Sequence, residues 1–394
     1  MINKRGIIHQ RIVIFIKIFL DLIFAPVLLL VATVARLSPF RIDVGFGPTP
    51  IINSPYHKLA MQKYGYRTEF FVDAIWYYTK DYDYAPTLLL HGPLRALIPY
   101  WLMIRTLLRY RTLYTYFDGG PLRATAWLYL FEPALLKLSG IKTVIMPFGA
   151  DVHALNRSPQ PYIVHAYCRD YPDHRYLRNK IICKIDLWST WADHIISGCD
   201  WVHYMPYWNT LMISHFAIDT DRVKLSAPKM INDETAPLRL LHAPNHKSLK
   251  GTEFILRAVD ELQSEGLDIN LRILEGVPND QVLSAIAEAD LVLDQLIIGW
   301  YAMFAIEAMA LETPCMCYLD PELICLYKRA GLLEDDECPL ISASPETIKD
   351  LLREIHGDRH LLREASAKSR LYVNRHHSID AIGSVFDKIQ KDLG

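Results

Sequence analysis

The chain has 394 residues, of which 51% are hydrophobic and 22% are charged, so it can bury more than one large core. This composition excludes disorder over most of the length, and the length excludes a single small module. Because 42 lysines and arginines are balanced by 44 aspartates and glutamates, the surface as a whole does not attract nucleic acid. The seven cysteines form no Cys-x-x-Cys pair, which favours a reducing compartment over a disulfide framework or a structural zinc site.

Residues 12–35 are the most membrane-like stretch of the chain. They are apolar apart from Lys17 and Asp21, and as a helix they would extend about 36 Å, enough to cross a bilayer core of about 30 Å. Lys17 and Asp21 are four residues apart and are expected to pair, and Pro26 is expected to kink or reverse the helix. The pattern favours an anchor that lies in the membrane plane or re-enters it; a single crossing helix and a buried core helix are the alternatives.

A second region with membrane character spans residues 85–117. It has no aspartate or glutamate, but it carries Arg105 and Arg109 on one expected helical face, close to Trp101. A basic amphipathic helix with an interfacial tryptophan is typical of a helix that lies on anionic lipid. The alternative is a solvated arginine face over an ordinary core stripe.

From residue 41 onward, apolar strand-like runs alternate with helical patterns. The first series of runs is IDVGF, TEFFVDAI, LYTYF, KTVIMPF and ADHIISG, and the second is LRLLHAP, INLRILEG, DLVLDQL and PCMCYL. Runs that are apolar on both faces and alternate with helices predict parallel sheets covered by helices. Residues 226–239, between the two series, are rich in proline, serine and charge, which marks a connection between domains.

These patterns predict an α/β protein with four parts. A membrane-anchoring segment (residues 1–40) is followed by two similar α/β domains (41–228 and 229–375) and by a C-terminal helix (376–394) that packs back across the domains. Ligands of open parallel sheets bind beyond the carboxyl ends of the strands. The active site is therefore expected in the cleft between the two domains.

The stretch HAPNHKSLKGTE, residues 242–253, lies between an expected strand and an expected helix. Lys247 and Lys250 would both point into this loop, beside exposed helix N–H groups. Basic side chains at the start of a helix favour anion binding, and pyrophosphate is the commonest anion of such sites. A solvated lysine pair is the plainer alternative.

Glu307 is the one ionisable side chain in an apolar helical run at residues 303–311. An unpaired carboxylate in such surroundings would be unstable, so Glu307 is expected to face a partner. The ribose hydroxyls of a nucleotide would supply hydrogen bonds to its charge. Bonding of Glu307 to loop N–H groups is the structural alternative.

One series of motifs resembles the donor domain of GT-B glycosyltransferases of family 4. The series is Lys-Gly-Thr at the start of a helix, followed by an apolar strand, an aspartate, a loop and Glu-Ala-Met-Ala-x-x-x-Pro. The resemblance extends over nearly the whole chain after residue 40. It implies two Rossmann-like domains facing a cleft, with the nucleotide sugar bound mostly by the second domain, the acceptor by the first, and transfer with retention of configuration. It also implies that Lys250, before Gly251, contacts the donor phosphates and that Glu307 contacts the ribose.

Two positions depart from the family pattern. The glutamate expected eight residues before the ribose-contacting one is replaced by Gly299. Trp300 and Tyr301 follow it, and main-chain N–H groups of this loop are expected to approach the donor. The basic residue expected five positions before the family's lysine is Asn245, so its phosphate-binding role is assigned to Lys247.

Three loops of the first half supply candidates for the acceptor side. GFGPTPIIN contains Gly47 and resembles the family's glycine loop. This loop also resembles a dinucleotide-binding fingerprint, but a proline stands in the place of the third glycine, which argues against a nicotinamide enzyme. FGADVH contains Gly149, Asp151 and His153, and Asp151 is expected to orient an acceptor hydroxyl, with helix capping as the alternative. Asp118, in the turn FDGG, is a weaker candidate that turn chemistry alone would explain.

Together these features predict a membrane-associated hexosyltransferase, with Asp151, Lys250 and Glu307 as catalytic residues. It would move a sugar from a nucleotide diphosphate donor to an acceptor, a lipid-linked glycan precursor of polysaccharide biosynthesis, at the cytosolic membrane face. No metal or other cofactor is expected, because lysine and helix N–H groups can stabilise the departing diphosphate. Expected partners are the nucleotide sugar, the acceptor and membrane lipids, and not nucleic acid. A catalytically silent nucleotide-binding or assembly subunit is the alternative, and a sugar-nucleotide epimerase is a third hypothesis.

Overall fold

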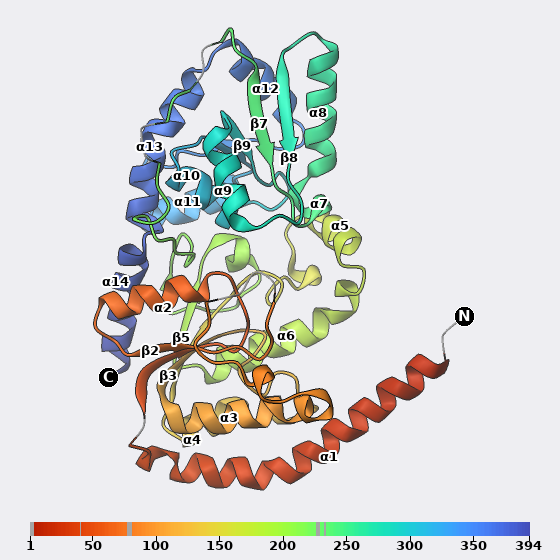
Figure 1. The fold of residues 1–394 in the computed structure, drawn as a ribbon, viewed down its shortest axis with the longest axis vertical. Coiled ribbons are helices and arrows are strands. Elements are labelled where there is room, and N and C mark those ends of the chain that lie inside the picture. Colours follow the sequence, from red (N-terminus) through yellow and green to blue (C-terminus); the bar gives the residue numbers. More distant parts are fainter. Residues whose placement is uncertain (1–3, 40, 77–80, 226–228, 232–233) are drawn as a thin grey trace.

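The structure, a computed structural model, describes the backbone of residues 4–10 and all atoms of residues 11–39, 41–76, 81–225, 229–231 and 234–394. Two parallel sheets lie in separate halves of the molecule, and helices cover both (Figure 1). This arrangement confirms the predicted α/β architecture of two Rossmann-like units. The predicted connection at residues 226–239 includes 226–228 and 232–233, which lie outside the described residues.

The first sheet has the strand order β2-β1-β3-β4-β5-β6, and its pairings are all parallel. Its strands are β1 (Ile42–Phe46), β2 (Thr68–Phe70), β3 (Tyr110–Tyr116), β4 (Lys142–Met146), β5 (His194–Ser197) and β6 (Thr210–Leu211). The helices of this half are α2 (Ser54–Lys63), α3 (Ile98–Arg109), α4 (Glu132–Leu138), α5 (Pro161–Asp170) and α6 (His174–Trp191), with 3-10 turns at η1 (Ala35–Leu37), η2 (Pro86–Leu88), η3 (Gly92–Leu97), η4 (Leu128–Leu130), η5 (Leu155–Arg157) and η6 (Cys199–His203).

The second sheet has the order β11-β10-β9-β7-β8, again with parallel pairings. Its strands are β7 (Leu238–His242), β8 (Ile269–Ile273), β9 (Leu291–Leu293), β10 (Cys315–Cys317) and β11 (Ile341–Ser342). The helices are α7 (Lys247–Lys250), α8 (Thr252–Ser264), α9 (Asn279–Glu288), α10 (Met303–Ala310), α11 (Pro321–Arg329), α12 (Ile348–Gly357) and α13 (His360–His376). The central strand β9 is buried on both faces, as expected when helices cover both sides of a sheet.

The last helix, α14 (Ile379–Leu393), follows the second sheet in sequence but packs on the first. The ring of Phe386 lies 5.1 Å from that of Tyr114 and 5.2 Å from that of His57, measured between centroids. Gly383 lets α14 approach α2, because a Cβ at this position would lie 2.8 Å from a carbonyl oxygen of α2. The core of the first domain is therefore completed by the C-terminus of the chain.

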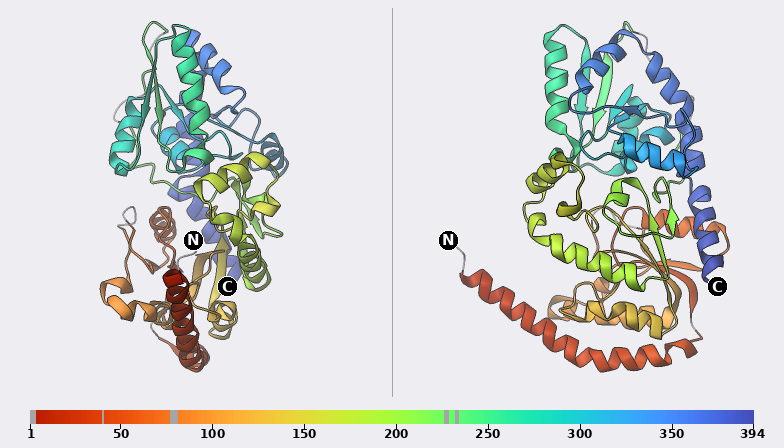
Figure 2. Two further views of the ribbon diagram at one scale, coloured as in Figure 1. Left: turned by 90° about the vertical axis from the view of Figure 1, so that its right-hand side faces the viewer. Right: turned by 180° about the vertical axis from the view of Figure 1, so that it is seen from behind.

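The N-terminal helix α1 (Lys4–Val34) runs along the outside of the first domain (Figures 1 and 2). The prediction that Lys17 and Asp21 pair is wrong, because each finds a partner in the segment after β3. Asp21 accepts hydrogen bonds of 2.8 to 3.2 Å from the N–H groups of residues 126–128, and the Lys17 ammonium donates to the Ala124 carbonyl oxygen at 2.7 Å. The helix continues through Pro26 as one curved element, so the predicted reversal is also wrong.

The arginines of α3 are engaged within the protein. Arg105 and Arg109 both reach the carboxylate of Glu69 on β2, at 2.5 and 3.1 Å. Both guanidinium groups are therefore paired with Glu69, and 40% of the Arg109 side chain remains exposed. That this helix lies on anionic lipid stays a prediction. All seven cysteines are free thiols.

We expect that Phe386→Ala will destabilise the protein by about 3–5 kcal/mol, because the side chain is fully buried in the first domain's core. Lys388→Ala, an exposed change two residues further along the same helix, should alter the free energy of unfolding by less than about 0.5 kcal/mol. Urea unfolding of the two variants measures the difference. Equal effects would show that α14 is not part of that core.

Candidate functional site

The ends of strands from the two sheets meet at the junction of the domains. The Tyr327 hydroxyl of α11 donates to the carbonyl oxygen of Cys199, which follows β5, at 2.7 Å. The Asn53 amide, at the start of α2, contacts the sulfur of Met303, at the start of α10, at 3.2 Å. Parallel sheets bind their ligands at this edge, so the candidate site lies here.

A buried ion pair marks the donor side of this junction. Asp294 directly follows β9 and is fully buried, and the ammonium of Lys250, at the end of α7, lies 2.5 Å from its Oδ1. The other carboxylate oxygen of Asp294 has no hydrogen bond within the described part of the chain. Because a buried carboxylate without a counter-charge is strongly unfavourable, this pair fixes the ammonium of Lys250 at the strand ends.

Glu307 lies on α10 beside this pair. Its side chain is buried, and the amide of Asn279 donates to it at 3.1 Å. Burial raises the pKa of Glu307 to about 7; the Asn279 hydrogen bond opposes this and the charge of Asp294 adds to it. Burial also raises the pKa of Tyr56 on α2, with the charge of Glu307 as the next contribution. Glu307 therefore faces the first domain across the junction.

The short helix α7, which precedes the predicted helix, has amides bound by a carboxylate of the first domain. Asp170, at the end of α5, accepts hydrogen bonds from the N–H groups of Ser248 and Leu249 at 3.2 and 2.9 Å. The helix predicted after Lys250 and Gly251 is α8, which begins at Thr252 as expected. That an anion binds at the start of α8 stays a prediction.

The other donor-side candidates in this loop do not join Lys250. The ammonium of Lys247 pairs with Glu275 at 2.9 Å and is 61% exposed, so Lys247 lies on the surface. Asn245 is also exposed. Gly251 has a left-handed φ of 72°, and a Cβ here would lie 3.0 Å from the Cβ of Leu296, so glycine allows the turn that brings Lys250 to the strand end.

The loop after β9 is anchored by its own aromatic side chains. Trp300 and Tyr301 are buried, and the Tyr301 hydroxyl bonds Tyr372 and His377 at 2.8 Å each. Gly299 packs against Asp320, whose Cβ would lie 2.7 Å from a Cβ at position 299. The two aromatic side chains thus belong to the core, and this loop offers only its main chain to a ligand.

On the acceptor side, Asp151 joins the ends of two strands. Its carboxylate accepts hydrogen bonds from the N–H groups of Phe148, Gly149 and Phe117 at 2.9 to 3.0 Å. Burial raises the pKa of Asp151 to about 7. The charge of Asp118 adds to this rise, and the hydrogen bonds from Phe148 and Gly149 oppose it. The carboxylate therefore closes the FGADVH loop onto the segment that follows β3.

His153 lies in a buried polar cluster two residues further on. Its Nε2 bonds the Asp200 carboxylate at 2.8 Å, and its Nδ1 bonds the Tyr167 hydroxyl. The His174 ring also bonds the carbonyl oxygen of His153, at 2.8 Å. This cluster ties α5 and α6 to the strand ends, and His153 is fully used within it.

Asp118 and Gly47 have structural explanations. Asp118 pairs with Lys184 and Arg123, both at 2.5 Å. Burial raises the pKa of Asp118, but these two cations outweigh burial and lower it overall. Gly47 has φ 145°, and a Cβ there would lie 2.2 Å from the carbonyl oxygen of Phe71, so only glycine fits.

Glu132, on α4, lies under the turn that follows Asp118. Its side chain is fully buried, its Oε1 accepts from the Leu122 N–H at 3.1 Å, and its Oε2 has no hydrogen bond in the described part of the chain. Burial raises its pKa to about 8, although hydrogen bonds from the N–H groups of Leu122 and Gly120 oppose the shift. Glu132 therefore carries a proton at neutral pH.

The structure thus pairs Lys250 with Asp294, places Glu307 where the charge of Asp294 acts on it, and places Asp151 on the first domain. Asp294 was visible in the sequence as the ionisable residue directly after an apolar strand. Asp170 gave no such signal, because its role depends on the docking of α5 beside α7. In the residues that the structure describes, no group of three histidine, cysteine, aspartate or glutamate side chains is arranged to hold a metal ion.

Comparison with known proteins shows the fold. No family model and no curated protein matches the chain. Among solved structures, sucrose-phosphate synthase from Thermosynechococcus elongatus is similar, with a TM-score of 0.57 and 12% identity over 90% of this chain and 99% of that one. The glycosyltransferase SnogD from Streptomyces nogalater aligns less closely, with a TM-score of 0.42 and 12% identity over 89% of this chain and 99% of that one. The chain therefore has the GT-B fold that its sequence predicts.

The buried carboxyl of Glu132 predicts a specific pH dependence of stability. The pKa of Glu132 is raised from 4.5 to about 8 in the folded protein. Its contribution to the free energy of unfolding is therefore fully present below pH 4.5 and is lost as the pH rises towards 8. Glu132→Gln should remove up to about 1.4 kcal/mol per pH unit from the pH dependence of unfolding in this window. Urea unfolding between pH 5 and 8 tests this, and identical slopes for the two proteins would contradict it.

Proposed function

We propose that this protein is a glycosyltransferase that moves a sugar from a nucleotide diphosphate donor to an acceptor. The GT-B fold supports sugar transfer in general, and the second domain carries the motifs expected of a donor site. The observation that carries the proposal is the buried Lys250–Asp294 pair with Glu307 beside it, at the strand ends that face the first domain.

Lys250 would bind the donor diphosphate without leaving Asp294. A lysine ammonium has three N–H donors, and Asp294 takes one of them at 2.5 Å. The remaining donors would bind phosphate oxygens and stabilise the negative charge that grows on the departing diphosphate. Glu307, once deprotonated, would accept hydrogen bonds from the ribose hydroxyls.

Asp151 would position the acceptor. Its Oδ1 accepts two N–H hydrogen bonds and its Oδ2 accepts one, which leaves a lone pair on Oδ2 for an acceptor hydroxyl. A carboxyl with a pKa of about 7 is partly ionised at neutral pH and would also polarise that hydroxyl. Retention of configuration and transfer of a hexose rest on the family 4 resemblance and belong to the proposal.

The proposed acceptor is a lipid-linked glycan precursor at the cytosolic membrane face, as in polysaccharide biosynthesis. The apolar helix α1 supports this, because its most apolar 18-residue window has a mean hydropathy of 2.6 and only 11% of that window is buried. Within the described residues it is the one helix that is long and apolar enough to cross a membrane by length and composition. No metal or other cofactor is part of the proposed reaction.

A second candidate is a catalytically silent subunit that binds nucleotides. It is favoured by Gly299, which stands where the family pattern has a glutamate and which has no room for a side chain against Asp320. Such a protein would bind the nucleotide sugar but would not release nucleoside diphosphate when an acceptor is added.

The proposed reaction is tested first with purified full-length protein and a panel of nucleotide sugars. A donor that binds the folded state should raise the melting temperature by an amount that grows with the logarithm of its concentration over Kd. Addition of a lipid-linked acceptor should then cause sustained release of nucleoside diphosphate. Binding without release would favour the silent subunit, and the absence of any thermal shift across the panel would contradict both candidates.

Glu307→Gln should weaken donor binding roughly tenfold or more, because it removes a charge-assisted hydrogen bond to the ribose. Since the pKa of Glu307 is about 7, donor affinity of the native protein should rise between pH 6 and 8, and that of the variant should stay flat. Glu364→Gln, which alters an exposed ion pair with Lys368 on α13, is the matched control. Calorimetric titration provides the measurement, and parallel pH profiles for native protein and Glu307→Gln would contradict the ribose contact.

A further inference from the structure

One stripe of α1 belongs to the core of the first domain. Asp21, Leu28, Ala32 and Ala35 along and just after α1 are all fully buried. Their spacing of seven, four and three residues places them on one side of a helix. α1 is therefore packed lengthwise against the domain over its second half.

Asp21 fastens the middle of α1 to the domain. The carboxylate accepts the hydroxyl of Tyr100 on α3 at 2.5 Å, in addition to the three N–H groups of residues 126–128. Burial and the bond to Asp21 raise the pKa of Tyr100, so the phenol stays protonated and remains a donor. The ring of Phe24, one turn further on, stacks on Tyr100 with centroids 4.3 Å apart.

The opposite side of α1 is apolar and uncovered. Phe15, Phe19, Leu22 and Leu30 are 70%, 56%, 62% and 66% exposed, and their spacing places them on one side of the helix. α1 lies at the end of the first domain that is remote from the second sheet (Figures 1 and 2). An apolar strip of this length on a protein surface marks an interaction site.

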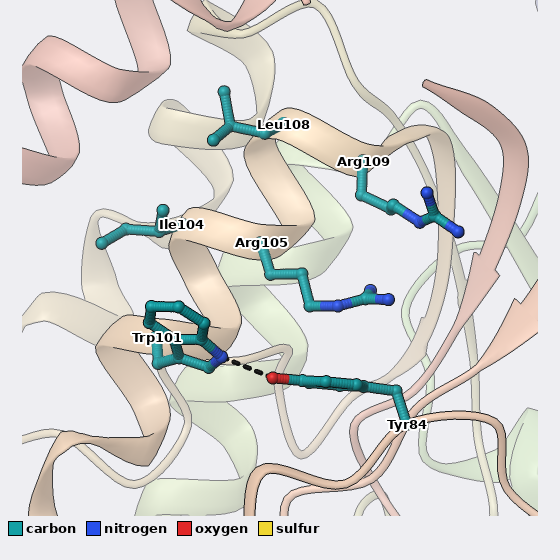
Figure 3. Close-up of a pocket in the computed structure, with 6 residues that line it drawn as sticks. All are labelled: Tyr84, Trp101, Ile104, Arg105, Leu108 and Arg109. Carbon is teal, nitrogen blue, oxygen red and sulfur yellow. Dashed lines mark hydrogen bonds between the residues drawn. The ribbon is translucent and has the colours of Figure 1, made fainter. Parts of the chain in front are cut away.

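The neighbouring helix α3 continues this apolar surface. An open pocket of about 330 Å³ is lined by Tyr84, Trp101, Ile104, Arg105, Leu108 and Arg109. Figure 3 shows Trp101, Ile104 and Leu108 along one edge of α3, while Arg105 extends over the ring of Tyr84. Trp101 is 50% exposed and Leu108 is 36% exposed. These side chains lie next to α1, and tryptophan is typical of the boundary between lipid headgroups and acyl chains.

The charge of the N-terminal segment identifies the occupant of this surface. Residues 1–39 contain Lys4, Arg5, Arg11, Lys17 and Arg36, and the one acidic residue among them is the buried Asp21. Basic residues that flank an apolar helix face are attracted to anionic lipid headgroups. A bilayer that contains anionic lipid complements both the apolar side and the charge.

The hydrogen bonds of the Asp21 carboxylate determine whether α1 crosses the bilayer or lies in its plane. A crossing helix would carry Asp21 towards the bilayer centre and would separate its carboxylate from Tyr100 and from residues 126–128, leaving buried polar groups unpaired. A helix that lies in the plane keeps these four hydrogen bonds. We propose that the first domain docks on one leaflet through the exposed side of α1 and the adjoining edge of α3, as a monotopic protein with both ends of α1 on the cytosolic side.

This inference deepens the proposed membrane location and rests on it, but it does not depend on the chemistry of the cleft. The topology is tested in sealed vesicles whose cytosolic face is outward, with full-length protein that carries an epitope at each terminus. Added protease should remove both epitopes. Protection of the N-terminal epitope with loss of the C-terminal one would overturn the proposal in favour of a crossing helix.

Docking is tested by flotation of purified protein with phosphatidylcholine vesicles, with and without phosphatidylglycerol. Phosphatidylglycerol should strengthen binding, and Phe19→Glu and Leu22→Glu should each weaken it by about tenfold or more, since each removes an apolar side chain from the lipid contact. Leu371→Glu, at a 73% exposed position on α13, is the matched control and should bind normally. Unchanged melting temperatures show that the α1 variants remain folded.

The absence of vesicle binding by the native protein, or equal binding by the α1 variants and the control, would overturn the proposal. Sugar transfer to a soluble acceptor, measured on the same samples, separates the two hypotheses. Failure of docking with transfer retained would leave the enzymatic proposal intact. Binding to vesicles without sugar transfer would count against the enzymatic proposal only.

Discussion

The buried pair between Lys250 and Asp294 is the interaction on which the donor side depends. Asp294 ends a strand that is buried on both faces, and its carboxylate is stable there because an ammonium lies 2.5 Å away. That ammonium comes from the segment after β7, so the pair joins two neighbouring strand ends of the second sheet. Gly251 permits the left-handed turn that follows Lys250. The result is a cation held at the sheet edge before any ligand arrives.

The first domain meets this edge through α5. Asp170 binds the amides at the start of α7, while Ile163, Ala166 and Tyr167 pack with Leu249 and Ile297 in one hydrophobic cluster. The same helix is tied to the acceptor-side loop through the contact of Tyr167 with His153. α5 therefore contacts both α7 on the donor side and the loop that contains Asp151 on the acceptor side.

Much of the fold could be predicted from the sequence because strand runs of parallel sheets are apolar on both faces. IDVGF became β1 with the same bounds, and the other runs contain β2, β4, β5 and β7 to β10. LYTYF only overlaps β3, which begins earlier, at Tyr110. That Lys250 and Glu307 face the cleft was expected from their place after strands and stays a prediction. The partners could not be predicted, since the contacts of Asp21, Lys247 and Asp170 join segments that are distant in sequence or depend on side-chain direction. Periodicity describes one helix at a time and does not identify what covers it.

The central claim is that the ammonium of Lys250 binds the diphosphate of a nucleotide donor. It is tested most directly by calorimetric titration of nucleoside diphosphates into Asp294→Asn and into the double variant Lys250→Met/Asp294→Asn, in which no buried carboxylate is left without its partner. The account predicts that the double variant binds roughly tenfold or more weakly than Asp294→Asn, because a charge-assisted hydrogen bond is lost. Equal affinities of the two variants would contradict it.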